Sequence, residues 1–146
     1  MIRDVLSRFE RDKRGVAAIE FAIVIVPLLL FMFGIIEFSR AYWAKEALQQ
    51  TAGNTARCMG LGLSTSGCTS TSGGQAYAVS GGNTWGLTIP TSNVIITSAS
   101  GTTCGGVSGF VTVHITYTFK TVVTDLIAGL FNDTLYASAC FPSGNF

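Results

Sequence analysis

The chain begins with a short charged stretch that is followed by a long apolar run. From Val16 to Ile36 there are 21 residues, and Glu20 is the only ionisable one. At about 1.5 Å per residue, this run would form a helix roughly 30 Å long, enough to cross the hydrocarbon core of a bilayer. A carboxylate inside such a run costs several kcal/mol unless it is paired, protonated or near the interface. Glu20 therefore needs a compensating interaction.

After the apolar run the pattern becomes that of an amphipathic helix. Small and apolar residues recur at spacings of three and four, at Ala41, Ala44, Leu48, Ala52, Thr55 and Met59. Tyr42 and Trp43 stand where an interfacial aromatic belt would lie. Glycines at and after Gly60 provide a helix stop. The sequence thus predicts one long helix over 16–60, bent by Pro27 inside the bilayer.

The remaining residues, 61–146, predict a small β-rich domain. Thirty of the 50 residues in 60–109 are Gly, Ser or Thr, which indicates turns and loops joining short strands. The clearest strand alternates apolar residues such as Val111 with polar ones such as Thr112. The expected elements are strands at 85–89, 93–98, 110–119 and 135–140, and a short helix at 126–131. Together with the long helix they give an α+β fold with a small antiparallel sheet.

Charge is scarce and unevenly placed. Charged residues make up 12% of the chain and hydrophobic residues 48%. Residues 1–15 carry five basic and three acidic side chains, whereas after Cys58 only Lys120, Asp125 and Asp133 are charged. By the positive-inside rule, the leader 1–15 is expected in the cytoplasm and the C-terminal domain across the membrane.

The cysteines agree with an exported domain. There are four, at Cys58, Cys68, Cys104 and Cys140. They contain no Cys-x-x-Cys pair, and the single His114 is near none of them in sequence, so two disulfides in an oxidising compartment are favoured over a zinc site. Sequence alone allows three pairings. We prefer one that joins Cys58 to Cys68 and Cys104 to Cys140.

The start of the helix resembles a known processing signal. A basic leader precedes Gly15, and Glu20-Phe21 follows four residues later at the mouth of the apolar run. This arrangement resembles type IV prepilins, which are cut by a prepilin peptidase. Within that group, the segment Arg14-Gly15-Val16-Ala17-Ala18-Ile19-Glu20-Phe21 is similar to TadE-like minor pilins (pseudopilins) of tight-adherence, or Flp, pilus systems.

The resemblance implies a role in a pilus that attaches cells to surfaces and supports biofilms. Arg14 and Gly15 would present the cleavage site, and the cut would leave an α-ammonium group on Val16. Glu20 of one subunit could neutralise that group on its neighbour, while Phe21 and the helix pack in a filament core. The implied partners are the prepilin peptidase, other pilins, the assembly platform and the bacterial inner membrane.

Other interpretations of residues 1–38 remain open at this point. A secretory signal usually has an apolar core of about 7–15 residues, and this run is longer and contains an acid. An uncleaved signal anchor would make the protein a single-pass envelope protein whose periplasmic domain binds a partner. A type II secretion pseudopilin would share the cleavage but belong to different machinery.

The sequence offers little for catalysis or ligand binding. His114 is expected on the polar face of a strand, and no spacing supports a triad with Asp125 or Asp133. Gly73-Gly74 and Gly105-Gly106 lack the Lys-Ser/Thr and the strand–helix setting of a phosphate loop. The exported part has no basic patch, which disfavours nucleic acid as a partner. We therefore expect no enzyme activity, cofactor, metal or small-molecule substrate.

Overall fold

A computed structural model describes residues 14–98, 103–121 and 134–144. The leader before Arg14, the helix expected at 126–131 and the turn expected at Asn132-Asp133 lie outside the described residues. The chain divides into two compact units, with the boundary between Ser39 and Arg40. The α+β fold expected from the sequence is confirmed.

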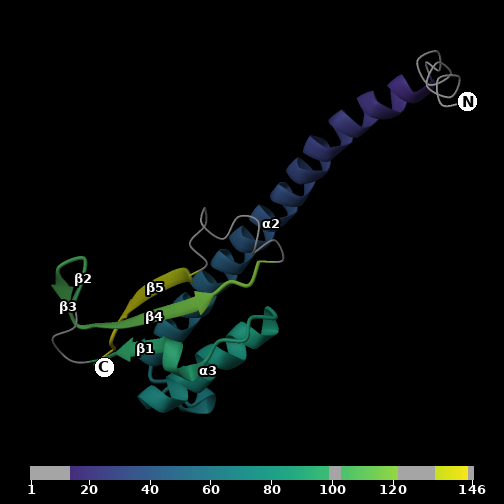
Figure 1. Cartoon of the computed structure of the whole chain (residues 1–146). Coiled ribbons are helices and arrows are strands. Elements are labelled where there is room, and N and C mark those ends of the chain that lie inside the picture. The colour runs from purple at the N-terminus through teal and green to yellow at the C-terminus, as the bar shows by residue number, and fades with distance from the viewer. Residues whose placement is uncertain (1–13, 99–102, 122–133, 145–146) are drawn as a thin grey trace, which may run out of the picture. The chain divides into compact units, whose positions relative to one another are not determined.

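The long helix is present. Helix α2 (Arg14–Gly60) is continuous through Pro27 and crosses the boundary between the two units (Figure 1). It ends at the glycine expected to stop it, and Gly62 adopts a left-handed φ of 59° just beyond. A positive φ suits glycine, which has no Cβ to clash with the carbonyl that follows.

The sheet of the second unit has three antiparallel strands in the order β1-β4-β5. A separate two-stranded hairpin is formed by β2 and β3. The bounds are β1 (Val94–Thr97), β2 (Thr103–Cys104), β3 (Val107–Ser108), β4 (Phe110–Thr118) and β5 (Thr134–Pro142). The strands expected at 93–98, 110–119 and 135–140 are therefore confirmed as β1, β4 and β5.

The alternation along β4 places one row of side chains in the core. Val111, Val113 and Ile115 are buried, and His114 is exposed on the opposite face. The polar row has one buried member, Thr112. Its neighbour on β5 is Cys140, whose disulfide partner lies in β2, and β2 contacts β4. The hairpin thus covers this end of the outer face.

A second helix was not foreseen from the sequence. Helix α3 (Thr71–Thr84) occupies part of the segment expected to be loops and strands, flanked by the short 3₁₀ turns η1 (Ser64–Ser66) and η2 (Thr91–Asn93). The strand expected at 85–89 is wrong. Leu87 and Ile89 are buried as the alternation suggested, but this stretch pairs with no strand among the described residues.

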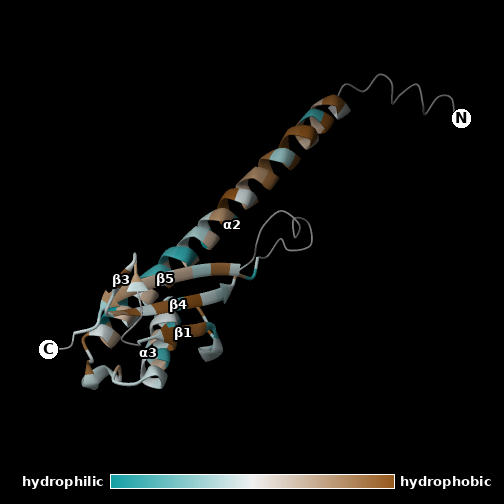
Figure 2. Ribbon diagram, turned by 90° about the vertical axis from the view of Figure 1, so that its left-hand side faces the viewer, coloured by the Kyte–Doolittle hydropathy of each residue, from teal (hydrophilic) through white to brown (hydrophobic). Residues whose placement is uncertain are grey.

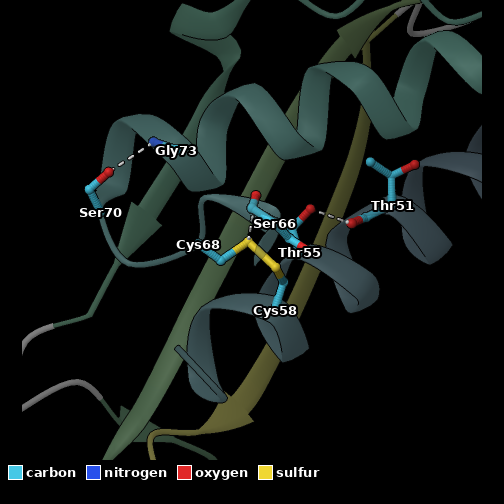
Figure 3. The surroundings of a disulfide bond; sticks show 7 residues. All are labelled: Thr51, Thr55, Cys58, Ser66, Cys68, Ser70 and Gly73. Atoms are coloured by element: carbon cyan, nitrogen blue, oxygen red, sulfur yellow. Dashed lines mark hydrogen bonds between the residues drawn. A yellow bond between two sulfur atoms is a disulfide. The ribbon is translucent and has the colours of Figure 1, made fainter. Parts of the chain in front are cut away.

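Helix α3 begins at a side-chain cap. The hydroxyl of Ser70 accepts a hydrogen bond from the backbone N–H of Gly73, an N-cap that satisfies one free donor of the first turn (Figure 3). Its buried residues, Gly74, Ala78 and Gly82, recur every four positions and form one face. A Cβ on Gly74 would meet the side chains of Met59 and Ile96. Helix α3 therefore lies close to both α2 and β1.

The part of α2 in the second unit supplies the other side of the core. Its buried residues recur at spacings of three and four, at Ala44, Ala47, Leu48, Thr51, Ala52, Thr55 and Ala56. The Thr51 and Thr55 hydroxyls donate to backbone carbonyls one turn earlier, at Ala47 and Thr51. These buried polar groups are thus satisfied within the helix itself. Figures 1 and 3 show α2 and α3 on one side of the sheet.

The structure has the disulfide pairing preferred from the sequence. Cys58 is joined to Cys68, and Cys104 to Cys140. The first bridge is buried and ties the end of α2 to the loop that leads into α3 (Figure 3). The second joins the β2–β3 hairpin to β5.

Glutamines from the two helices bind backbone carbonyls of the outer strands. The Gln75 side chain donates a 2.9 Å hydrogen bond to the carbonyl of Val94 in β1. The Gln49 side chain donates a 2.7 Å hydrogen bond to the carbonyl of Ser138 in β5. These bonds attach both edges of the sheet to the helical layer.

Two glycines of α3 should respond oppositely to alanine. At Gly73 a Cβ would overlap the backbone carbonyl of Gly67, so Gly73→Ala is expected to destabilise the fold by about 1–3 kcal/mol or more. At Gly81 the nearest atom would be the Thr51 methyl group, 3.4 Å away, so Gly81→Ala should gain up to about 1 kcal/mol of helix propensity. Thermal unfolding of the full chain in detergent measures both. Equal effects would contradict the close contact at Gly67.

Candidate functional site

The N-terminal part of α2 exposes a large apolar surface. Apart from the half-buried Ile25, its large apolar side chains are exposed, as shown by Phe21 at 66%, Phe31 at 69% and Phe38 at 68% (Figure 2). Among the described residues, α2 is the one helix long and apolar enough to cross a membrane, and its apolar window is not buried inside the protein. An apolar surface of this extent requires non-aqueous surroundings. The segment is a candidate membrane span.

The expected processing residues lie in the first turns of this helix. Helix α2 begins at Arg14, so Gly15 and Val16 are already helical. A Cβ on Gly15 would meet no atom within 4 Å. Glu20 and Phe21 follow on the next turn and are both exposed. The structure thus gathers these residues at one end of a single helix.

Val16 and Glu20 are four residues apart and therefore lie on one face of that helix. Both are exposed, as is the apolar surface that follows them. A carboxylate on the surface of an apolar helix is available to a cation on a neighbouring helix.

The other residues considered for chemistry do not form a site in the described part of the chain. His114 is exposed on the outer face of the sheet, opposite Ile95 of β1 and Ser138 of β5. No group of three or more His, Cys, Asp or Glu side chains among the described residues could hold a metal ion. Asp125 and Asp133 lie outside the described residues.

The two glycine pairs have structural positions. Gly73-Gly74 lies in the first turn of α3, where one glycine approaches the backbone of Gly67 and the other packs in the core. Gly105-Gly106 forms the turn between β2 and β3, with φ of 62° and 87°. Both roles are explained by backbone geometry.

Two aromatic contacts at the start of the second unit could not be found from the sequence. Trp43 of α2 meets Trp85, which follows α3, edge to face with ring centroids 6.3 Å apart. The Arg40 guanidinium lies 5.6 Å from the ring centroid of Phe119, just after β4. The sequence placed an aromatic belt at Tyr42 and Trp43, and the fold brings two distant aromatic residues beside it.

The helix also matches a known family. Residues 15–57 match the family model described as TadE-like protein. Over these residues the chain is similar to TadE-like proteins. TadE-like proteins form a structural family associated with the tight-adherence pilus, and the match covers the apolar run, Gly15 to Phe21 of the expected processing signal, and the small-residue stripe of α2 except Met59. No curated protein and no solved structure was found to match the chain.

A charge in the middle of this helix should weaken its insertion into a bilayer. Val26 and Ile95 have nearly equal exposed fractions, 56% and 57%, but only Val26 lies in the candidate span. Arginine at the centre of a span costs about 3 kcal/mol, so Val26→Arg is expected to increase the alkaline-extractable fraction of the chain. Ile95→Arg should leave the chain in the membrane. Equal extraction of the two variants would contradict a bilayer-spanning role for α2.

Proposed function

We propose that this protein is a minor pilin of a tight-adherence pilus. It inserts in the inner membrane through the apolar part of α2, is cut by a prepilin peptidase between Gly15 and Val16, and then acts in pilus assembly for surface adherence and biofilm formation. The observation that carries the proposal is the exposed apolar segment of α2 with a Gly-x4-Glu-Phe signal at its start, inside the TadE-like match.

The orientation follows from charge. The leader carries five basic side chains, and the positive-inside rule keeps such a segment in the cytoplasm. The second unit then lies in the periplasm or outside the cell. Its two disulfides suit that oxidising side of the membrane.

The cut has a physical consequence for Glu20. Removing the leader creates an ammonium group on Val16, and a subunit packed alongside could bring that group to its neighbour's Glu20. In an apolar bundle an unpaired charge is very costly, whereas a paired one is tolerated. The carboxylate would therefore fix the axial position of one subunit against the next. Partners in this step are other pilins and the assembly platform.

Cleavage should depend on Gly15 and not on helix glycines in general. Gly15 and Gly34 are both helical, and a Cβ at either would meet no atom within 4 Å, so neither position limits side-chain size in the fold. Gly15→Leu is expected to block cleavage by the peptidase, because it places a bulky side chain at the position directly before the cut. Gly34→Leu should be cut normally. Intact mass and N-terminal sequencing, with and without an active prepilin peptidase, make the comparison.

The same measurement separates the competing functions. A chain beginning at Val16 only when the peptidase is active supports pilin-type processing. A chain that keeps its N-terminal residues in both strains would favour an uncleaved envelope protein. A chain beginning near Tyr42 would identify a secretory signal. A type II secretion pseudopilin would be cut in the same way, and it is distinguished by losing no function when the tight-adherence platform is deleted.

Glu20→Ala should separate processing from assembly. The variant is expected to be cut like the parent chain, because Gly15 and the leader are intact, but to enter the pilus fraction at a much lower level. Glu46 supplies the control, since it is an exposed carboxylate on the same helix outside the apolar run. Glu46→Ala should leave assembly unchanged. Normal assembly of Glu20→Ala would rule out the neighbour-pairing role.

A further inference from the structure

We propose that one end of the second unit rests on the membrane surface through an aromatic–basic patch. The patch consists of Arg40, Trp43, Trp85, Phe119 and Lys120. This inference depends on the membrane insertion of α2 in the proposed function, and it adds a bilayer contact made by residues outside that helix. The occupant is the headgroup region of the bilayer.

The first step is the position of Trp43. Phe38 is the last residue of the exposed aliphatic and phenylalanine surface of α2, and Trp43 follows five residues later, about 7.5 Å further along a helix and next to the exposed Tyr42. Tryptophan is enriched at the boundary between hydrocarbon and water, where its ring is partly apolar and its N–H remains solvated. Trp43 is 51% exposed, so about half of its surface is available to lipid.

The second step is that the fold brings Trp85 beside Trp43. Trp85 lies 42 positions later in the sequence, yet its ring is 6.3 Å from that of Trp43 and set at 72° to it. Trp85 is also exposed, at 39%, although the helix directly before it, α3, has a buried face. A contact that served only to hold α3 against α2 would not require two tryptophans with this much exposed surface. The pair forms one broad aromatic surface.

The third step is the cationic side of the patch. The Arg40 guanidinium lies against Phe119, and the exposed Lys120 follows Phe119 directly. Basic residues near a membrane surface gain about 1 kcal/mol each from anionic lipids. Two acidic residues of the same helix, Glu37 three positions before Arg40 and the exposed Glu46, offset part of this charge. The aromatic rings are therefore the main contact, and the basic groups favour anionic headgroups.

The bilayer is a suitable occupant because Trp43 of the patch lies on the same helix as the candidate membrane span. The apolar surface up to Phe38 and the aromatic surface from Trp43 belong to one helix, so a membrane that covers the first ends beside the second. The outer face of the sheet also exposes apolar groups, such as Ile95 and Tyr136, but these stand singly among polar residues. They lack continuity with an apolar surface.

The chain contains only two tryptophans, which makes the patch measurable by fluorescence. The Trp43→Phe chain reports Trp85 alone and keeps an aromatic ring against it. The full chain is reconstituted in vesicles of phosphatidylcholine and phosphatidylglycerol that contain lipids brominated either near the headgroup or near the chain end. Trp85 is expected to lose much more fluorescence to the shallow bromines than to the deep ones. Its emission maximum in vesicles should also lie at a shorter wavelength than that of the same chain unfolded in urea.

The control places a tryptophan at the other end of the second unit. Leu61 follows the end of α2, is 45% exposed, and is about 27 Å beyond Trp43 at the helical rise per residue. Leu61→Trp is made in a chain that also carries Trp43→Phe and Trp85→Phe. It should show no loss with either bromolipid.

The outcomes distinguish this inference from the proposed function. Alkaline extraction of the same vesicles tests insertion of α2, and an extractable chain would overturn both. If α2 is retained but Trp85 is quenched no more than the Leu61→Trp chain, the patch does not touch the bilayer and only this inference fails. If Trp85 is shielded from aqueous quencher only at high protein-to-lipid ratio, the patch contacts a second copy, which also overturns it.

Discussion

The close approach of α2 to the sheet and to α3 is the contact on which the second unit depends. Between Ala44 and Ala56 the buried face of α2 contains Leu48 as its one large side chain; the others are alanine and threonine. Small side chains lose little rotamer freedom on burial and let neighbouring backbones come near. The cost is that little apolar area is buried per residue, so the fit must be tight. An atom added along this face of α2 would therefore press against the sheet or α3.

Helix α3 packs in this core through glycine residues. Gly74 accommodates Met59 and Ile96, and Gly82 accommodates Ile89. Glycine in a helix interior costs about 1 kcal/mol relative to alanine, so α3 has poor intrinsic propensity. Three features offset that cost: the cap at Ser70, the packed face and the nearby disulfide at Cys68. The helix is held by its tertiary surroundings more than by its own sequence.

This explains which elements could be predicted from the sequence. The long helix and β4 are marked by strong apolar periodicity, and the structure has both. Helix α3 has no such periodicity, because its packed face is formed by Gly74, Ala78 and Gly82, and glycine in a Ser/Thr-rich stretch indicates a loop. Leu87 and Ile89 show the opposite error. Their alternation predicted their burial correctly, but it also predicted a strand, and this stretch pairs with no strand among the described residues.

The candidate site could be predicted only where it is contiguous in sequence. Gly15, Val16, Glu20 and Phe21 belong to one short motif, and helix geometry alone fixes their relative positions. The contact of Trp43 with Trp85 depends on where α3 ends against α2, which no local pattern encodes. The same holds for Phe119 beside Arg40. Long-range contacts of this kind require the fold.

Helix α2 combines an exposed apolar segment with a segment that packs in the core, and the division between them bears on the assembly proposed above. Among the described residues, none before Ala44 is buried, so the core of the second unit uses no side chain from the apolar span. Moving that span from lipid into a bundle of similar helices would exchange one apolar environment for another. The folded unit would keep its core, its disulfides and its helix–sheet contacts unchanged. Glu20, as the charged group of the span, is then the residue whose interactions must change most, and its pairing would decide whether the transfer is favourable.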